Sequence, residues 1–417
     1  MLLFLFYLSG TSGLIYEILW VRMFSLVFGN TTYAATIVLS AFFTGMALGS
    51  LFFGRKAKRL ALPFRIYGFL EIGIGLSALS VPFLVTMMDG FYPSLYLALG
   101  ERNPLFFALR FLLSFIILFI PTFLMGGTFP LLVKFTALLR QGFGKSVSLL
   151  YALNTFGGVT GAFLSGFFLV RYLGIYPAIV TGVVINVIVG CVAVILSKRF
   201  ITPEDVRTSY EPPTDQDQEP YASPANQANY ILGVAFITGV LSVSFEVVWA
   251  RLLVYVLSSS VYAFSIMLTT FLFGIALGSL IATWLIHRIK KIIALSGIIL
   301  VITGIYGVLT IPLMVFLAEK DEAIMRFFGF ASWPQYNGGR FFQSAIILLL
   351  PTILMGIVFP LIARIAKTVG KDESTVIGNV YFVNTGGAVL GSIIAGFLLV
   401  PFVGCKWSIL LLSSFQK

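Results

Sequence analysis

The sequence predicts an all-α integral membrane protein with about 12 transmembrane helices in two parallel six-helix repeats. The first observation is composition: 59% of the 417 residues are hydrophobic and 10% are charged, whereas soluble domains carry about 25% charged residues. The second is the apolar runs, whose length of about 20 to 27 residues suits helices that cross roughly 30 Å of hydrocarbon. A transmembrane barrel is excluded because its strands alternate polar and apolar residues in segments of about ten. The third is an internal repeat.

The expected helices are apolar runs separated by charged residues, Pro and Gly. In chain order the runs cover about 2–28, 31–54, 65–87, 107–137, 147–170, 175–197, 231–257, 261–286, 291–317, 340–366, 376–400 and 405–415. The last run is short, so we expect helix 12 to be short or truncated. The first run starts at Leu2 with no basic segment before it and no cleavage site after it, which predicts a retained span and not a signal peptide.

A polar stretch, 198–229, divides the chain into a first six-helix repeat (1–197) and a second (230–417). The stretch is acidic and rich in Pro, with almost no aliphatic residues, so it cannot bury enough surface to fold. It predicts a disordered cytoplasmic linker.

The two halves are related by a repeat at an offset of about 230 residues. The matched blocks are 12–25 with 242–254, 45–50 with 274–279, 121–134 with 351–364, 151–167 with 381–397, and Gly174 with Gly404. Because each half has six helices, both halves enter the membrane from the same side. The repeat is therefore parallel, as in the two halves of major facilitator transporters.

The charge pattern predicts the orientation. The net charge is +11, and the basic residues gather in alternate loops, as in RKAKRLALPFR after the second run and HRIKK after the eighth. This is the positive-inside pattern of a polytopic protein, which places the N-terminus in the cytoplasm and the protein in the cell inner membrane. Such a distribution does not favour nucleic acid as a binding partner, and we expect the lipid bilayer as the partner.

Few residues suit catalysis or metal binding. His287 is the sole histidine, and Cys191 and Cys405 belong to no motif, so a histidine-based metal site and a Ser-His-Asp triad are excluded within this chain. No nucleotide-binding signature is present. We expect no cofactor, no metal and no enzyme activity from this chain.

The block LSGTSGLIYEILWVRMFSLVFGNTTYAATIVLSAFFTGMALGSLFFGRKAKR and the later block NTFGGVTGAFLSGF resemble the membrane region of bacterial fused major facilitator/spermidine synthase proteins. The resemblance covers essentially the whole chain. In that family a soluble aminopropyltransferase domain often follows the membrane part, and no such domain is present in this sequence. The resemblance implies a polyamine as substrate or an aminopropyltransferase as partner, and implies no catalysis here.

Small and polar residues recur at matched positions within the helices. The pairs Gly45/Gly49, Gly157/Gly161, Gly274/Gly278 and Gly387/Gly391 are spaced for close helix packing. Prolines expected to kink their helices recur in the fourth and tenth runs: Pro121, Pro130, Pro351 and Pro360. Asn154 and Asn384 are matched in the fifth and eleventh runs and predict either an interhelical hydrogen bond or a substrate contact.

Glu17 and Glu246 lie near the middle of the first and seventh runs. A charge at a helix centre costs about 2.5–3.5 kcal/mol on insertion scales, so both should face the bundle interior. If the halves pack as in major facilitators, both carboxylates face one space and bind an organic cation, with one proton shared for coupling. Tyr16, Trp20 and Trp249, expected beside them, would add cation–π contacts.

The alternative is that each glutamate bonds an Arg or a backbone group of a neighbouring helix and locks the bundle. Glu71, near the start of the third run, has no acidic counterpart in the second half and is expected to be interfacial or paired with an arginine.

Two functions fit the sequence. The first is a secondary transporter of a small organic cation of polyamine type, with a midplane site between the halves. The second is a non-transporting membrane module that anchors or partners a soluble aminopropyltransferase.

Overall fold

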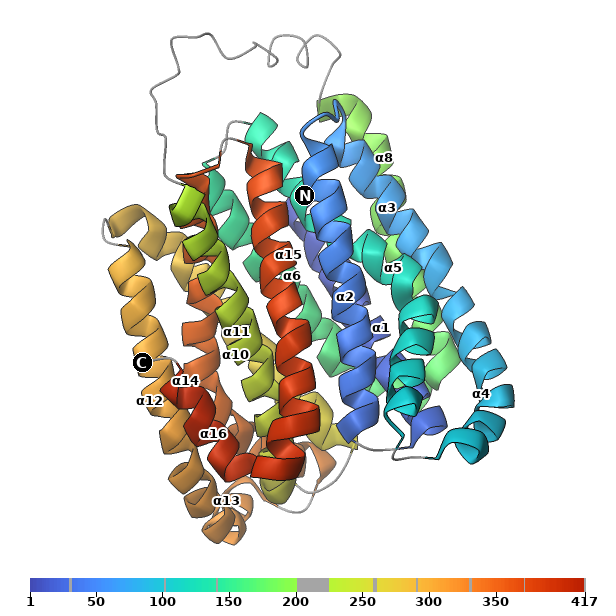
Figure 1. The fold of residues 1–417 in the computed structure, drawn as a ribbon, viewed down its shortest axis with the longest axis vertical. Helices are drawn as coiled ribbons and strands as arrows, with labels where there is room; N and C mark the ends of the chain where they lie inside the picture. Colours follow the sequence, from blue (N-terminus) through green and yellow to red (C-terminus); the bar gives the residue numbers. More distant parts are fainter. Residues whose placement is uncertain are drawn as a thin grey trace.

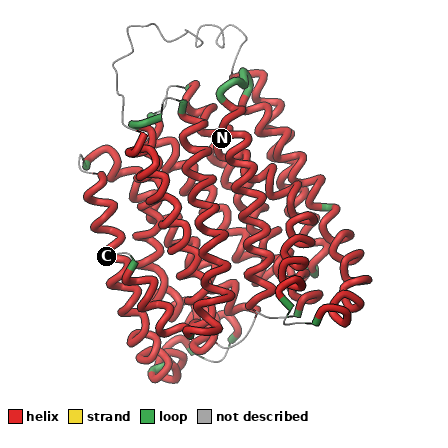
Figure 2. Tube along the Cα trace, viewed as in Figure 1, coloured by secondary structure: helices red, strands yellow, loops and turns green. Residues whose placement is uncertain are grey.

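The structure, a computed structural model, describes the whole chain except a few short segments and one long one. Those segments are 30–31, 101–102, 140–141, 201–224, 258–260, 290–291, 330–331, 371 and 416–417. The described part of the chain contains helices and no β-strand, arranged as one bundle (Figures 1 and 2). The expected all-helical membrane fold is confirmed.

Each half supplies its own set of helices. The first half comprises α1 (Leu2–Phe28), α2 (Thr32–Ala57), α3 (Pro63–Ala78), α4 (Ser80–Leu99), α5 (Pro104–Leu138), α6 (Phe143–Leu164), the π-helix η1 (Ser165–Leu169), α7 (Val170–Tyr172) and α8 (Ile175–Phe200). The second comprises α10 (Ala225–Leu257), α11 (Val261–Arg288), α12 (Ile292–Glu319), α13 (Asp321–Phe328), α14 (Trp333–Lys367), α15 (Glu373–Ile393), the π-helix η3 (Ile394–Val403) and α16 (Cys405–Ser414).

Among the described residues, 11 helical segments are long and apolar enough to cross a membrane. α3 and α4 together make one of them, Pro63–Leu99. α16 has ten residues, about 15 Å of helix, which is half of what a span needs. It ends partway along the bundle (Figure 1).

The expected linker, 198–229, falls largely outside the described residues. Helix α8 runs on to Phe200 and α10 begins at Ala225, so both ends of the predicted linker are helical. The remainder, 201–224, is not described.

The repeat extends to the backbone of the turns. Gly174 and Gly404, which are matched between the halves, have φ of 84° and 78°. Gly100 and Gly329 are matched as well, with φ of 75° and 90°. Residues other than Gly rarely adopt this left-handed region, so the same turn recurs in both halves because the same residue permits it.

The predicted glycine packing is confirmed at helix pairs that are equivalent in the two halves. A Cβ on Gly157 of α6 would lie 1.9 Å from the Tyr7 carbonyl oxygen of α1, and one on Gly387 of α15 would lie 2.1 Å from that of Phe236 in α10. These pairs therefore pack backbone against backbone, as small residues allow in membranes.

The halves meet along two seams, where α2 packs on α15 and α6 packs on α11. At the end of the bundle where α1 and α10 begin, one hydrophobic cluster joins both halves and includes Leu5, Phe6, Ile231 and Ala235. We call this the closed end; it lies at the top of Figure 1. Toward the opposite end, the large clusters belong mainly to one half each, and the halves meet there where Phe167 of η1 contacts Tyr262 and Trp333.

Candidate functional site: a carboxylate pair between the halves

Glu17 of α1 and Glu246 of α10 lie near the middle of their helices. Both side chains are partly exposed, although they sit among buried residues of the same helices. The two carboxyl groups come from opposite halves and lie within electrostatic range of each other, and we call the space between them the gap. Glu17 is also within range of the Tyr381 phenol on α15. Among the residues that the structure describes, neither carboxyl group has a hydrogen bond or ion pair. Two carboxyl groups without a protein partner can pair with a cation or share a proton.

An aromatic quartet joins the halves toward the closed end. It contains two residue pairs matched by the repeat, Phe129 with Phe359 and Tyr151 with Tyr381. The ring centroids of Tyr151 and Phe359 are 4.6 Å apart, and those of Phe129 and Tyr381 are 5.7 Å apart. Phe129 and Phe359 are also adjacent, at 6.5 Å. These rings fill the space between the halves on one side of the glutamates.

Polar contacts tie the halves together beyond the quartet. Thr283 of α11 donates to the Ser148 hydroxyl of α6, with 2.9 Å between the oxygens. Lys134 Nζ of α5 lies 3.5 Å from Asp372 Oδ1 at the start of α15. Burial raises the pKa of Asp372, but hydrogen bonds from Thr375 and Ser374 and the charge of Lys134 outweigh it and hold the pKa below its usual value.

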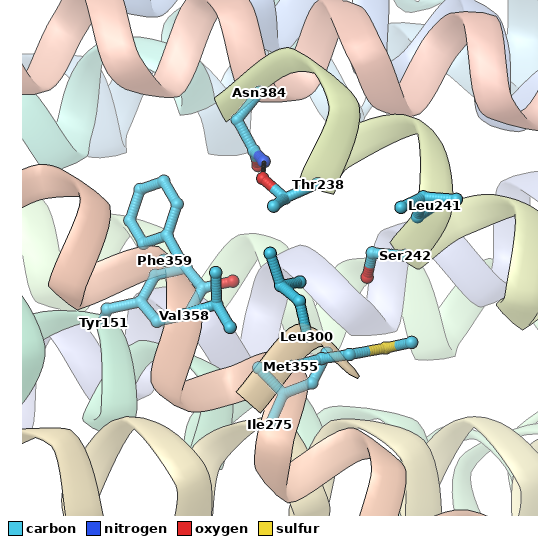
Figure 3. Close-up of a pocket in the computed structure, with 10 residues that line it drawn as sticks. All are labelled: Tyr151, Thr238, Leu241, Ser242, Ile275, Leu300, Met355, Val358, Phe359 and Asn384. Atoms are coloured by element: carbon cyan, nitrogen blue, oxygen red, sulfur yellow. Dashed lines mark hydrogen bonds between the residues drawn. The ribbon is translucent and has the colours of Figure 1, made fainter. Parts of the chain in front are cut away.

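A pocket opens beside α10, mostly within the second half (Figure 3). Its polar lining consists of Thr238, Ser242, Asn384 and Tyr151, the last contributed by the first half. Its apolar lining consists of Leu241, Ile275, Leu300, Met355, Val358 and Phe359. Glu246 follows Ser242 by four residues, so it continues the same face of α10 one turn further along.

Asn154 and Asn384 form interhelical hydrogen bonds, the first of the two alternatives that the sequence left open. The Asn154 amide donates to the Phe6 carbonyl of α1 at 3.1 Å, and the Asn384 amide donates to the Ala235 carbonyl of α10 at 2.9 Å. The two bonds are equivalent in the two halves. Asn384 also lines the pocket, whereas Asn154 does not.

The structure places Tyr16, Trp20 and Trp249 away from the gap, contrary to the expectation that they flank the glutamates. All three are 0% exposed. Tyr16 stacks on Trp20 and donates to Asn186 in the core of the first half, while the Trp249 indole lies 3.3 Å from the Thr310 hydroxyl. A ligand between the halves has no surface to contact on these rings.

Glu71 differs from the expectation of an interfacial or arginine-paired residue. It is fully buried within the first half, where it accepts hydrogen bonds from Ser9 at 2.6 Å and from the Asn186 amide at 2.5 Å. The network links α1, α3 and α8. Glu71 is thus the glutamate that locks helices together, through a residue, Asn186, that sequence reasoning missed.

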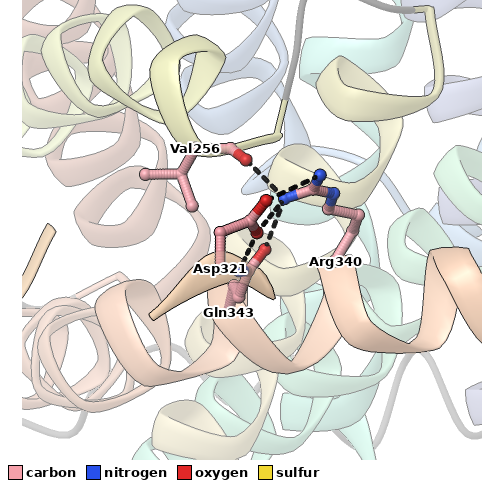
Figure 4. A network of polar contacts seen from close by, with 4 residues as sticks. All are labelled: Val256, Asp321, Arg340 and Gln343. Atoms are coloured by element: carbon pink, nitrogen blue, oxygen red, sulfur yellow. Dashed lines mark hydrogen bonds and ion pairs between the residues drawn. The ribbon is translucent and has the colours of Figure 1, made fainter. Parts of the chain in front are cut away.

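Two buried arginines were also missed, although the repeat pairs them at an offset of 230 residues. Arg340 of α14 donates to the Val256 carbonyl at 2.6 Å and pairs with Asp321 of α13 at 2.7 Å (Figure 4). Arg110 of α5 lies over the Phe106 ring and donates to Tyr92. Each arginine braces its own half at the end opposite the closed end, outside the carboxylate pair.

Within the described residues, no three His, Cys, Asp or Glu side chains gather closely enough to hold a metal ion. The polar groups of the glutamates and of the pocket are carboxyl, hydroxyl and amide groups, which bind ligands through charge and hydrogen bonds.

No protein-family model matches the chain. Among curated proteins, polyamine aminopropyltransferase 2 of Streptomyces coelicolor is 30% identical over 203 residues, which cover 47% of this chain and 34% of that protein. The chain thus corresponds to about a third of that relative's length.

Similar solved structures are transporters. The E. coli fucose:proton symporter has a TM-score of 0.59 at 16% identity, covering 100% of this chain and 97% of its own. A bacterial homologue of the iron transporter ferroportin, in the outward-facing state, has a TM-score of 0.61 at 14% identity, covering 100% and 96%. The human organic anion transporter MFSD10 has a TM-score of 0.55 at 12% identity, covering 99% and 96%. The chain is a multi-pass membrane protein with the fold of the major facilitator transporters.

Proposed function

We propose that this protein is a secondary transporter of a small organic cation of polyamine type, bound between the halves by Glu17 and Glu246. The observation that carries the proposal is a pair of carboxyl groups, matched by the repeat, that lie in one gap without a protein partner among the described residues. Intramembrane carboxylates that face a cavity mark substrate or ion pathways in membrane proteins.

A protonated amine suits this gap. A carboxylate and an ammonium group form charge-assisted hydrogen bonds, which are about twice as strong as neutral ones. Two carboxylates that share one space can also hold one proton between them, which would couple transport to a proton gradient.

The closed end has a role in the proposed transport cycle. The aromatic quartet and the Lys134–Asp372 pair close the end where α1 begins, while α1 and α10 do not pack closely against each other. By the positive-inside rule this end faces the cytoplasm, so we expect the contacts at the closed end to form a cytoplasmic gate. Release on the cytoplasmic side then requires the quartet to separate.

A second function is a non-transporting module that anchors or partners a soluble aminopropyltransferase. The similarity to polyamine aminopropyltransferase 2, of which this chain covers 34%, favours it. In this case the carboxylate pair would have no role in transport. The protein would then copurify with a synthase and show no uptake.

Uptake into proteoliposomes distinguishes the two functions. We expect the purified full chain to accumulate labelled putrescine or spermidine when a proton gradient is imposed, and Glu17→Gln or Glu246→Gln to abolish it. Glu319→Gln, which changes an exposed glutamate at the end of α12, is the matched control and should retain uptake. Accumulation no greater than in empty liposomes, from protein that melts cooperatively, would refute the transporter function.

A further inference from the structure

The residues that line the pocket of Figure 3 on α10 differ from their equivalents in the first half. Thr238 and Ser242 correspond in the repeat to Ser9 and Gly13. In the first half the Ser9 hydroxyl bonds the buried Glu71 carboxyl, and Asn186 bonds the same group. In the second half the corresponding face of α10, which carries Thr238 and Ser242, lines the pocket. The pocket therefore offers polar groups on the second-half side to a ligand held by the two glutamates.

Three polar groups in this pocket are available to a ligand. The Asn384 amide nitrogen donates to the Ala235 carbonyl and the Thr238 hydroxyl, which leaves its carbonyl oxygen as an acceptor. The hydroxyls of Ser242 and Tyr151 have no hydrogen bond to any described residue, whereas serines such as Ser244 and Ser279 bond backbone carbonyls. Polar groups inside an apolar bundle normally form hydrogen bonds, so these three groups are free to bond a ligand.

The rest of the pocket wall is apolar. Leu241, Ile275 and Met355 contribute aliphatic and thioether surface beside the polar groups. Ser242 and Glu246 are about 6 Å apart along the helix axis. A ligand that bridges them needs a cationic end, a short apolar middle and a second hydrogen-bond donor.

We propose that this pocket is a second subsite for the far amine of a short α,ω-diamine whose near ammonium group pairs with Glu17 and Glu246. The methylene chain lies along the apolar wall, and the far amine donates to the Asn384 carbonyl oxygen and the two hydroxyls. This inference rests on the proposed function and adds to it that the site prefers a diamine to a monoamine.

The test compares putrescine with n-butylamine, which has the same carbon chain and one amine. Their affinities are measured by calorimetry on the purified full chain, as wild type, as the double variant Ser242→Ala/Tyr151→Phe, and as Ser25→Ala. Ser25 is the matched control because its hydroxyl bonds the Val21 carbonyl on its own helix. Phe at position 151 keeps the ring that packs on Phe359, and unchanged melting temperatures verify folding.

We expect wild type and Ser25→Ala to bind putrescine at least about tenfold more tightly than n-butylamine, as hydrogen bonds to a charged group predict. The double variant should lose this preference through weaker putrescine binding, with n-butylamine binding unchanged. Equal losses for both amines, or an unaltered preference, would overturn the subsite. Failure of both amines to bind wild type would instead overturn the proposed cation site itself, so the two failures are distinguishable.

Discussion

Two adjacent glycines in α15 give a sharp test of how the halves are built. A Cβ on Gly387 would lie 2.1 Å from the Phe236 carbonyl oxygen of α10, whereas a Cβ on Gly386 meets no atom within 4 Å. Ordinary contact begins near 3.4 Å, so Gly387→Ala requires α10 and α15 to separate by about 1 Å. Gly386→Ala requires no movement.

The two substitutions are expected to change the free energy of unfolding in opposite directions. Overpacking of this kind costs about 1–3 kcal/mol, and separation of the helices also strains the Asn384–Ala235 hydrogen bond, worth about 0.6 kcal/mol in a membrane protein. Replacing Gly by Ala within a helix otherwise favours the helix by up to about 1 kcal/mol. Gly387→Ala should therefore lower the free energy of unfolding, while Gly386→Ala should leave it unchanged or raise it.

Unfolding of the purified variants in mixed detergent micelles, followed by circular dichroism, measures this difference. The gain in helix propensity is common to both variants and cancels, so we expect them to differ by about 1–3.5 kcal/mol. Gly157→Ala, at the equivalent contact with the Tyr7 carbonyl, should behave like Gly387→Ala. Equal stability of the Gly386 and Gly387 variants would refute the close approach of α10 and α15 and, with it, the packing assigned to the repeat.

Three further outcomes are expected. Glu71→Gln should lower the melting temperature, because it disturbs a buried network of α1, α3 and α8, yet retain cation binding; loss of binding at unchanged stability would contradict the locking role. In a background without Cys191 and Cys405, the cysteine pair Ser148→Cys/Thr283→Cys should form a disulfide that blocks uptake until it is reduced. Uptake that continues after complete cross-linking would contradict a closed end that moves during transport. The pKa of Asp372 is held below its usual value, so its contribution to the Lys134 contact should be constant above about pH 4, the ordinary Asp range, and decline only as the pH falls further. Asp372→Asn should remove that contribution at every pH. The measurement is the rate at which a cysteine placed at the closed end is labelled, which should rise when the Lys134 contact is lost.

The fold was predictable because its signals are local or repeated. Apolar runs fix the spans, and the repeat fixes which helix pairs are equivalent, so the contacts of Gly157 and Gly387 follow from the sequence. The same repeat also pairs Arg110 with Arg340, a signal that was present and not used.

The surroundings of the glutamates were not predictable in the same way. Trp20 is three residues from Glu17, about 60° around the helix, and α1 packs against α2, α6 and α8. Two side chains that differ by 60° around α1 can therefore point one into the gap and the other into the core. The i+3 spacing alone does not show which residue faces which side. The role of Glu71 depends on Asn186, which is 115 residues away in the chain and carries no pattern that links the two.

The most direct test of the central claim, that Glu17 and Glu246 form one cation site, is equilibrium binding of labelled putrescine to the purified protein and its Glu→Gln variants. Because the two carboxylates share one ligand, each single variant should lose at least about tenfold in affinity, with an unchanged melting temperature. The double variant should bind little worse than either single variant. Retained binding together with a lowered melting temperature in Glu17→Gln and Glu246→Gln would contradict the site and assign both residues to a structural lock.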